Sequence, residues 1–150
     1  MASTSAKPLK TYDPRDVIVL LNGIPIGGFA DGTFININRN VETFGYLTGV
    51  DGEFVRFKRA DKSGLITLTL NQSSDSNSIL QSQHELDLIS NTGAFGIFIS
   101  YKFTGATYTS SNAFVVSHPD ADLSKEATTR EWKILCDPLE IREVGLGLGF

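Results

Sequence analysis

Hydrophobic and polar residues alternate along most of this chain, which is typical of β-strands that shelter one face from water. Residues 64–70, for example, read Gly-Leu-Ile-Thr-Leu-Thr-Leu. The pattern predicts strands over residues 16–21, 24–26, 33–39, 54–60, 64–70, 95–103, 107–117 and 128–136. The stretch 107–117 is either one strand with a break near 110–112 or a pair of strands. The chain is therefore expected to be mainly β.

Residues 77–90 carry the one convincing helical pattern of the chain. Apolar or uncharged positions recur three or four residues apart at Ile79, Leu80, Gln83, Leu86 and Ile89. This spacing predicts an amphipathic helix with one buried face. Asp75 or Ser76 is placed to cap its start, and Asn-Thr-Gly at 91–93 suits a left-handed helix end. One helix thus interrupts a chain of strands.

Two stretches between the strands carry further information. Asn22-Gly23 is a strong signal for a tight hairpin turn, and Pro25 places the returning strand at a sheet edge or at its own first residue. Residues 40–53 combine glycines with four large apolar side chains, at Phe44, Tyr46, Leu47 and Val50. That loop is too long and too apolar for an ordinary surface turn. Exposed aromatic residues there suggest a docking surface.

The ends of the chain differ from its middle. A length of 150 residues suits a single domain, here taken as 1–150. Residues 1–15 are polar and contain two prolines, so we expect an extended arm. Residues 144–150 alternate glycine with Val, Leu, Leu and Phe. Such a tail is costly to order and gains nothing in water, so we expect it to pack on a neighbouring subunit or on its own sheet.

Composition narrows the class of protein. Hydrophobic residues make up 41% and charged residues 20%, as in soluble globular domains. The most apolar run, 17–21, is far too short to span a bilayer, and the polar start is unlike a signal peptide, so a cytosolic, untargeted product is expected. A formal net charge of −4 disfavours tight wrapping of DNA, which requires a surplus of Lys and Arg.

Basic residues gather in one short segment, at Arg56, Lys58, Arg59 and Lys62. They fit either a solvated strand edge that discourages wrong pairing or a patch that meets an acidic neighbour.

Candidate catalytic chemistry is sparse. His84 and His118 lack a partner motif, the glycines between 23 and 32 precede no phosphate-binding motif, and the acidic residues lack the spacing of a calcium loop. The single cysteine, Cys136, excludes an internal disulfide and is expected to be a buried, inert thiol. Trp132 is expected in the core rather than as a sugar platform. We expect no enzyme activity, no cofactor and no metal site.

The order of several segments resembles that of tail tube proteins of contractile-tailed bacteriophages. The segments are Val17-Ile-Val-Leu with Asn22-Gly23, Gly28-Phe-Ala-Asp-Gly-Thr-Phe34, Gly49-Val-Asp-Gly-Glu53, Ser63-Gly-Leu-Ile-Thr-Leu-Thr-Leu70 and Thr129-Arg-Glu-Trp-Lys-Ile-Leu-Cys136. Together they extend the resemblance over residues 12–138. It implies the fold shared with type VI secretion tube proteins, in which two antiparallel sheets form a sandwich or distorted barrel with one flanking helix.

The resemblance also implies a function. Six subunits would close into a ring, and rings would stack into a hollow tube that lets DNA pass without binding it specifically. The implied partners are the tail sheath, baseplate and tape measure proteins, and the implied location is the virion after assembly in the host cytoplasm. Two alternatives stay open, a type VI secretion-like tube protein and a monomeric β-sandwich that binds a ligand.

Two sets of residues are candidates for assembly under this interpretation. The apolar loop and its basic neighbours are expected to join stacked rings, through Phe44, Tyr46, Leu47, Val50, Arg56, Lys58 and Arg59. Strand alternation nominates polar residues for the channel wall, namely Asn36, Asn38, Thr67, Thr69, Glu131 and Lys133.

Overall fold

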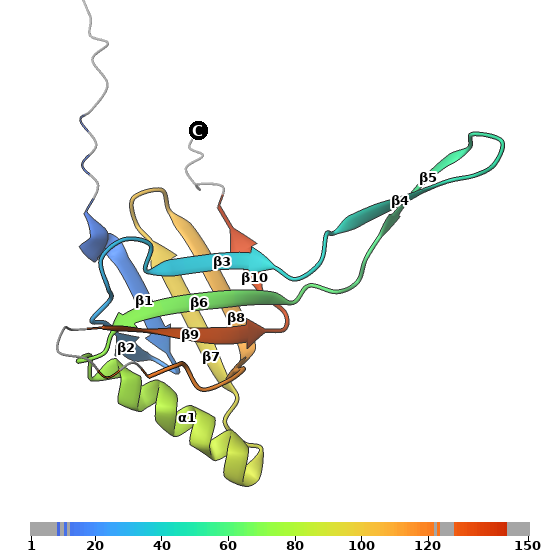
Figure 1. Ribbon diagram of the computed structural model, residues 1–150. Helices are drawn as coiled ribbons and strands as arrows, with labels where there is room; N and C mark the ends of the chain where they lie inside the picture. The colour runs from blue at the N-terminus through green and yellow to red at the C-terminus, as the bar shows by residue number, and fades with distance from the viewer. Residues whose placement is uncertain (1–8, 10, 12, 122, 124–127, 144–150) are drawn as a thin grey trace, which may run out of the picture.

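The computed structural model describes residues 9, 11, 13–121, 123 and 128–143. Its elements are the 3-10 helix η1 (Pro14–Asp16), β1 (Val17–Leu21), β2 (Ile24–Ile26), β3 (Ile35–Arg39), β4 (Phe44–Thr48), β5 (Phe54–Lys58), β6 (Gly64–Asn71), α1 (Ser76–Ser90), β7 (Phe95–Tyr101), β8 (Ala106–Val115), β9 (Thr129–Cys136) and β10 (Glu140–Arg142) (Figure 1). Most of the expected arm, 1–15, and all of the expected tail, 144–150, lie outside the described residues, so both stay predictions.

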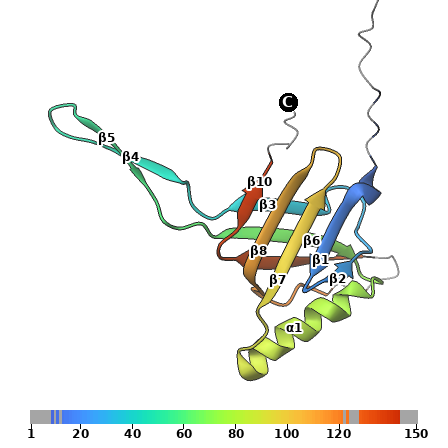
Figure 2. The same ribbon diagram turned by 180° about the vertical axis from the view of Figure 1, so that it is seen from behind.

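The main sheet is antiparallel and has eight strands, in the order β2-β1-β7-β8-β9-β6-β3, with β10 paired to β8. It folds into two crossed layers, one of β3, β6 and β9 and the other of β1, β7 and β8 (Figures 1 and 2). Strand β8 connects the layers, because it pairs with β7 of one layer and its last residues pair with β9 of the other. Within the described residues, β2 and β3 do not pair with each other, so the sandwich stays open rather than closing into a barrel. The expected mainly β fold with one helix is confirmed.

The core lies between the two layers, where the inward side chains of alternating strands meet. Strand β6 shows the alternation clearly, since every second residue from Gly64 to Leu70 is buried. Trp132 of β9 is fully buried among them, and its indole Nε1–H donates to Asn77 Oδ1 at 2.8 Å. The expectation of a core tryptophan is confirmed. A buried indole with its polar edge already bonded is not available as a sugar platform.

Helix α1 lies across one end of the sandwich and continues past it (Figure 2). Ile79 and Leu80 pack on the core, as the helical periodicity predicts. Leu86 and Ile89, however, are 44% and 84% exposed. The expectation of one continuous buried face is therefore wrong for the second half of the helix, because the sheets beneath it end before the helix does.

The two ends of α1 are fixed differently. Asp75 occupies the N-cap position without a capping hydrogen bond from its side chain. The hydroxyl of Ser74 accepts the Ser76 N–H at 3.2 Å instead, while Ser76 Oγ accepts the Gly27 N–H at 2.9 Å. Asn91 ends the helix with a φ of 59°, as expected for this residue type. The start of the helix is thus tied to the loop that follows β2.

The turn predicted at Asn22-Gly23 and the ambiguous stretch 107–117 are both resolved in the structure. Asn22 and Gly23 both adopt positive φ, 52° and 84°, and join β1 to the edge strand β2 that contains Pro25. The ambiguous stretch 107–117 forms one strand, β8, and a register shift against β7 near Ile97 absorbs the irregularity. A bulge of this kind lets a long strand bend between layers.

Candidate functional site

The most unusual feature of the molecule is a two-stranded ribbon, β4 with β5, that projects away from the sandwich (Figure 1). Its strands pair antiparallel from Phe44 opposite Lys58 to Thr48 opposite Phe54. Residues 44–48, within the apolar loop expected over 40–53, form the strand β4. An isolated two-stranded ribbon is marginally stable by itself, so this one is expected to be stabilised by something outside the subunit.

Both faces of this ribbon, which we call the hairpin, expose large apolar side chains. Tyr46 and Phe54 point to one face and are 70% and 63% exposed, and Leu47 and Val55 on the other face are 67% and 49% exposed. Val50 at the tip is fully exposed. Apolar surface presented on two sides of a projecting element marks a binding surface rather than scattered surface residues.

Contacts between aromatic and basic side chains give the hairpin its shape. The rings of Tyr46 and Phe54 stack with centroids 5.4 Å apart. The Arg56 guanidinium lies 4.7 Å from the centre of the Phe44 ring, and that of Arg59 lies 5.3 Å from Phe57. Within the described residues neither arginine forms an ion pair. Their charges are therefore available to an acidic neighbour.

The base of the hairpin borders a basic hollow of about 420 Å³. Five of its lining residues are cationic, namely Arg39, Lys58, Arg59, Lys62 and Arg142, against the two carboxylates Asp61 and Glu140. Hydrogen bonds from Ser63 lower the pKa of the exposed Asp61 carboxyl. The basic residues at 56–62 are thus joined by Arg39 of β3 and Arg142 of β10. The sequence alone did not show that these two arginines lie beside them.

The six polar residues nominated for a channel wall share one surface of the sandwich. Asn36 of β3 pairs with Thr67 of β6, which pairs with Lys133 of β9, and Thr69 pairs with Glu131 beside them. Asn38 follows two residues after Asn36 on the same face. All six lie on the outer face of the β3-β6-β9 layer, opposite the buried side chains of the same strands. We call this surface the polar face.

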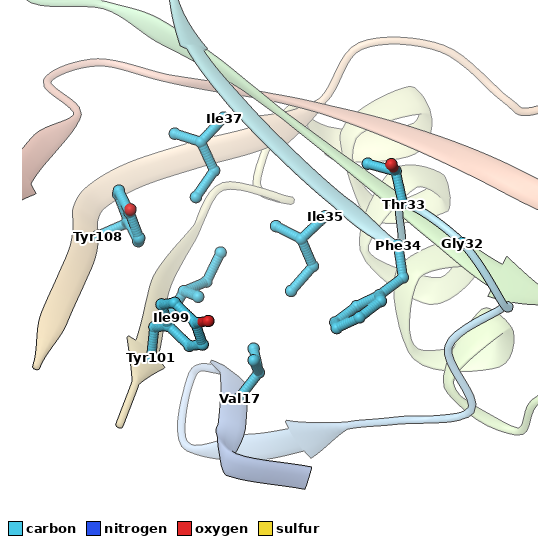
Figure 3. Close-up of a pocket in the computed structure, with 9 residues that line it drawn as sticks. All are labelled: Val17, Gly32, Thr33, Phe34, Ile35, Ile37, Ile99, Tyr101 and Tyr108. Carbon is cyan, nitrogen blue, oxygen red and sulfur yellow. The ribbon is translucent and has the colours of Figure 1, made fainter. Parts of the chain in front are cut away.

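An apolar groove opens between the layers at the free edge of β3 (Figure 3). It holds about 350 Å³. Its main lining residues are Val17, Phe34, Ile35, Ile37, Ile99, Tyr101 and Tyr108. Sequence reasoning did not find the groove, because four strands distant in the chain build it. A local signal was the pair of tyrosines at 101 and 108, each flanked by polar residues on a strand.

Burial raises the pKa values of two side chains, those of Cys136 and Tyr108. Burial raises the pKa of the Cys136 thiol to about 11, as expected for an inert cysteine. Burial and the Glu143 carboxylate raise the pKa of Tyr108 to about 12, and the Tyr108 hydroxyl donates to Glu143 Oε2 at 2.9 Å.

Among the described residues, no three His, Cys, Asp or Glu side chains are grouped as metal ligands. The helix of the described part lacks the length and hydropathy to cross a membrane.

The fold is that of chains found in contractile injection systems. It matches a chain of the PVC sheath-tube complex of an extracellular contractile injection system in the extended state, with a TM-score of 0.59 and 20% identity over 95% of this chain and 100% of that one. It also matches a chain of the anti-feeding prophage cap that terminates the tube, with a TM-score of 0.58 and 19% identity over 95% and 99%. At this identity the likeness establishes the shared fold.

The sequence defines the family more closely. The chain belongs to the bacteriophage PhiTE tail tube protein family, whose model matches residues 26–144. It is also 30% identical to structural protein ORF10 of Pseudomonas phage KPP10 in an alignment of 132 residues that covers 83% of this chain and 76% of that protein. The resemblance to phage tail tube proteins is confirmed, and the chain is a structural component of a phage tail.

Proposed function

We propose that six copies of this chain close into a ring and that such rings stack into the inner tube of a contractile phage tail, through which DNA leaves the capsid. The role is structural rather than catalytic. The observation that carries the proposal is the hairpin, which exposes aromatic and aliphatic side chains on both faces and has its apolar surface uncovered within its own subunit.

Ring closure is supported by the open edges of the sheet. In β3, alternate residues bond to β6, as shown by the flanking bonds from Thr69 N–H to Phe34 O and from Asn40 N–H to Ser63 O. The backbone groups of Ile35 and Ile37 therefore point to the free edge. An unpaired edge pairs readily with another strand, and a ring of identical subunits satisfies every such edge in turn.

Stacking is supported by the chemistry of the hairpin. Its aromatic rings supply apolar area, and Arg56, Lys58 and Arg59 supply charge that favours one docking orientation over others. All seven residues that we nominated for contacts between rings lie on the hairpin or at its base. Six of the seven lie within 44–58, so a neighbouring ring would meet them as one surface.

The polar face is the proposed wall of the channel. It mixes amide, hydroxyl and oppositely charged groups, and Glu131 and Lys133 lie two residues apart on the same strand. The whole chain has a formal net charge of −4. A wall without a basic surplus would let DNA slide, because it does not hold the phosphates.

Further partners follow from the same proposal. A contractile sheath would surround the tube, a baseplate would hold it, and a tape measure protein would set its length, in virions assembled in the host cytoplasm. The sheath-tube complex that contains a chain of this fold supports the first of these contacts. A secretion-type tube has the same geometry, and the match to a phage tail tube family favours DNA as the cargo.

Electron microscopy of the purified protein at increasing concentration tests the assembly. We expect rings and tubes with a central hole, and sedimentation should show the monomer disappearing as they form. A discrete monomer at every concentration, with a melting temperature that rises on adding a small ligand, would instead identify a binding module.

The orientation of the polar face can be tested with a bulky thiol reagent. We expect a polyethylene glycol maleimide to modify Asn36→Cys in free subunits but not in tubes, because the reagent is too large for the channel. Glu85→Cys, exposed on α1, is the matched control and should react in both forms. Cys136 is buried and contributes no signal. Modification of Asn36→Cys in tubes at the rate seen for free subunits would place the polar face elsewhere.

A further inference from the structure

The groove at the free edge of β3 is an incomplete part of the core. Val17, Ile35, Ile37 and Tyr108 pack against the buried cluster yet stay partly exposed, whereas Val19 and Ile99 next to them are about 1% exposed. The two layers separate here, and their inner side chains line the opening instead of meeting (Figure 3). An apolar hollow of this size is stabilised when apolar side chains fill it.

The described chain ends beside this groove. Strand β10 runs antiparallel to the first half of β8, and Ile141 pairs with Tyr108, one of the lining residues. Glu143, the last described residue, accepts a hydrogen bond from the Tyr108 hydroxyl. Whatever follows Glu143 therefore starts at the rim of the groove.

We propose that residues 144–150 turn back into the groove of their own subunit and complete its core with Leu146, Leu148 and Phe150. Seven residues reach at most about 24 Å when extended, which is ample for a groove that begins at their first residue. The segment has apolar side chains at alternate positions, and the glycines between them allow its backbone to approach the lining residues closely. This inference concerns the folding of one subunit and does not depend on tube assembly.

Charge and proximity favour this occupant over the hairpin of a second copy. Among the described residues, those that line the groove include no carboxylate that could receive Arg56, Lys58 or Arg59 of a hairpin, and Glu143 at the rim already accepts the Tyr108 hydroxyl. Residues 144–150 carry no charged side chain. A segment tethered at the rim also has a high effective concentration there, which a separate molecule lacks.

A disulfide between the tail and the groove tests the proposal in the full-length protein, diluted to keep it monomeric. We expect Leu148→Cys with Ile37→Cys to form an intramolecular disulfide under mild oxidation, visible as a faster-migrating monomer on a non-reducing gel. Leu148→Cys with Asn36→Cys is the matched control, because Asn36 lies on the opposite face of the same strand, and it should form at least tenfold less. Ile35→Cys in place of Ile37→Cys provides a second pair should the first fold poorly.

Three results would overturn the proposal. Equal yields for the Ile37 and Asn36 pairs would show a tail that does not enter the groove, and so would the absence of a disulfide in folded variants of both groove positions. Disulfide-linked dimers in place of the intramolecular product would show that the tail occupies a second copy. None of these outcomes bears on whether rings stack, which microscopy of the unmodified protein reports separately.

Discussion

Replacing Tyr46 and Phe54 together by alanine is expected to abolish tubes while leaving the subunit folded. The two rings stack on each other and are mostly exposed, so they contribute little to the stability of the free subunit. Each ring is about two-thirds exposed, so burying it at an interface contributes about 2 kcal/mol and the pair contributes about 4 kcal/mol at each hairpin contact. That loss corresponds to roughly three orders of magnitude in the association constant.

Electron microscopy and sedimentation measure this effect, and circular dichroism checks the fold. Tyr46→Phe is the matched control, because it keeps the ring and its stacking on Phe54 and should still form tubes. Point substitutions are cleaner than deleting 44–50, which removes all of β4 and leaves β5 without its partner. Tubes of normal length from the double alanine variant would exclude the hairpin from stacking.

Replacing Trp132 by alanine is expected to lower the free energy of unfolding by about 3–5 kcal/mol, the usual cost of emptying a buried aromatic site. Domains are stable by only about 5–15 kcal/mol, so the variant should be largely unfolded or melt about 6–20 °C lower. The indole is fully buried where Trp132 of β9 pairs with Leu68 of β6, and its N–H holds Asn77 at the start of α1. The substitution therefore weakens both the core and the attachment of the helix.

Urea unfolding followed by circular dichroism measures the loss, since the only tryptophan is removed. The comparison is best made in the double alanine background at Tyr46 and Phe54, where assembly does not add to the apparent stability. Trp132→Phe serves as the control, because it keeps most of the buried volume and loses the hydrogen bond to Asn77, which costs about 1–3 kcal/mol. A loss below about 1 kcal/mol for alanine would contradict the packing described for the core.

Local signals in the sequence predicted much of the fold. Asn22-Gly23 defined a hairpin because two residues with positive φ are needed there and this pair tolerates them. The alternation in 64–70 and 129–136 predicted which side chains are buried, including Trp132. The same alternation selected six polar residues for the channel wall that lie on one face of the sheet. They do so because paired strands place residues that are opposite one another on the same face.

Features set by the extent and pairing of distant elements could not be predicted. The spacing of Leu86 and Ile89 shows that they lie on one side of the helix, but it does not show where the sheet beneath them ends. Residues 44–48 form a strand although both faces are exposed, so no alternation distinguishes them from a loop. The groove depends on how far β3 stands from β1, β7 and β8, which no local pattern encodes.

The hairpin leaves the sandwich at one place only, where Arg39 of β3 pairs with Gly64 of β6. A column built from such subunits is consequently polar. The rings at its two ends differ. One end ring would expose its projecting hairpins, and the other would expose the surfaces that bind hairpins. If the subunits stack in this way, a protein that binds one end of the tube would not fit the other end.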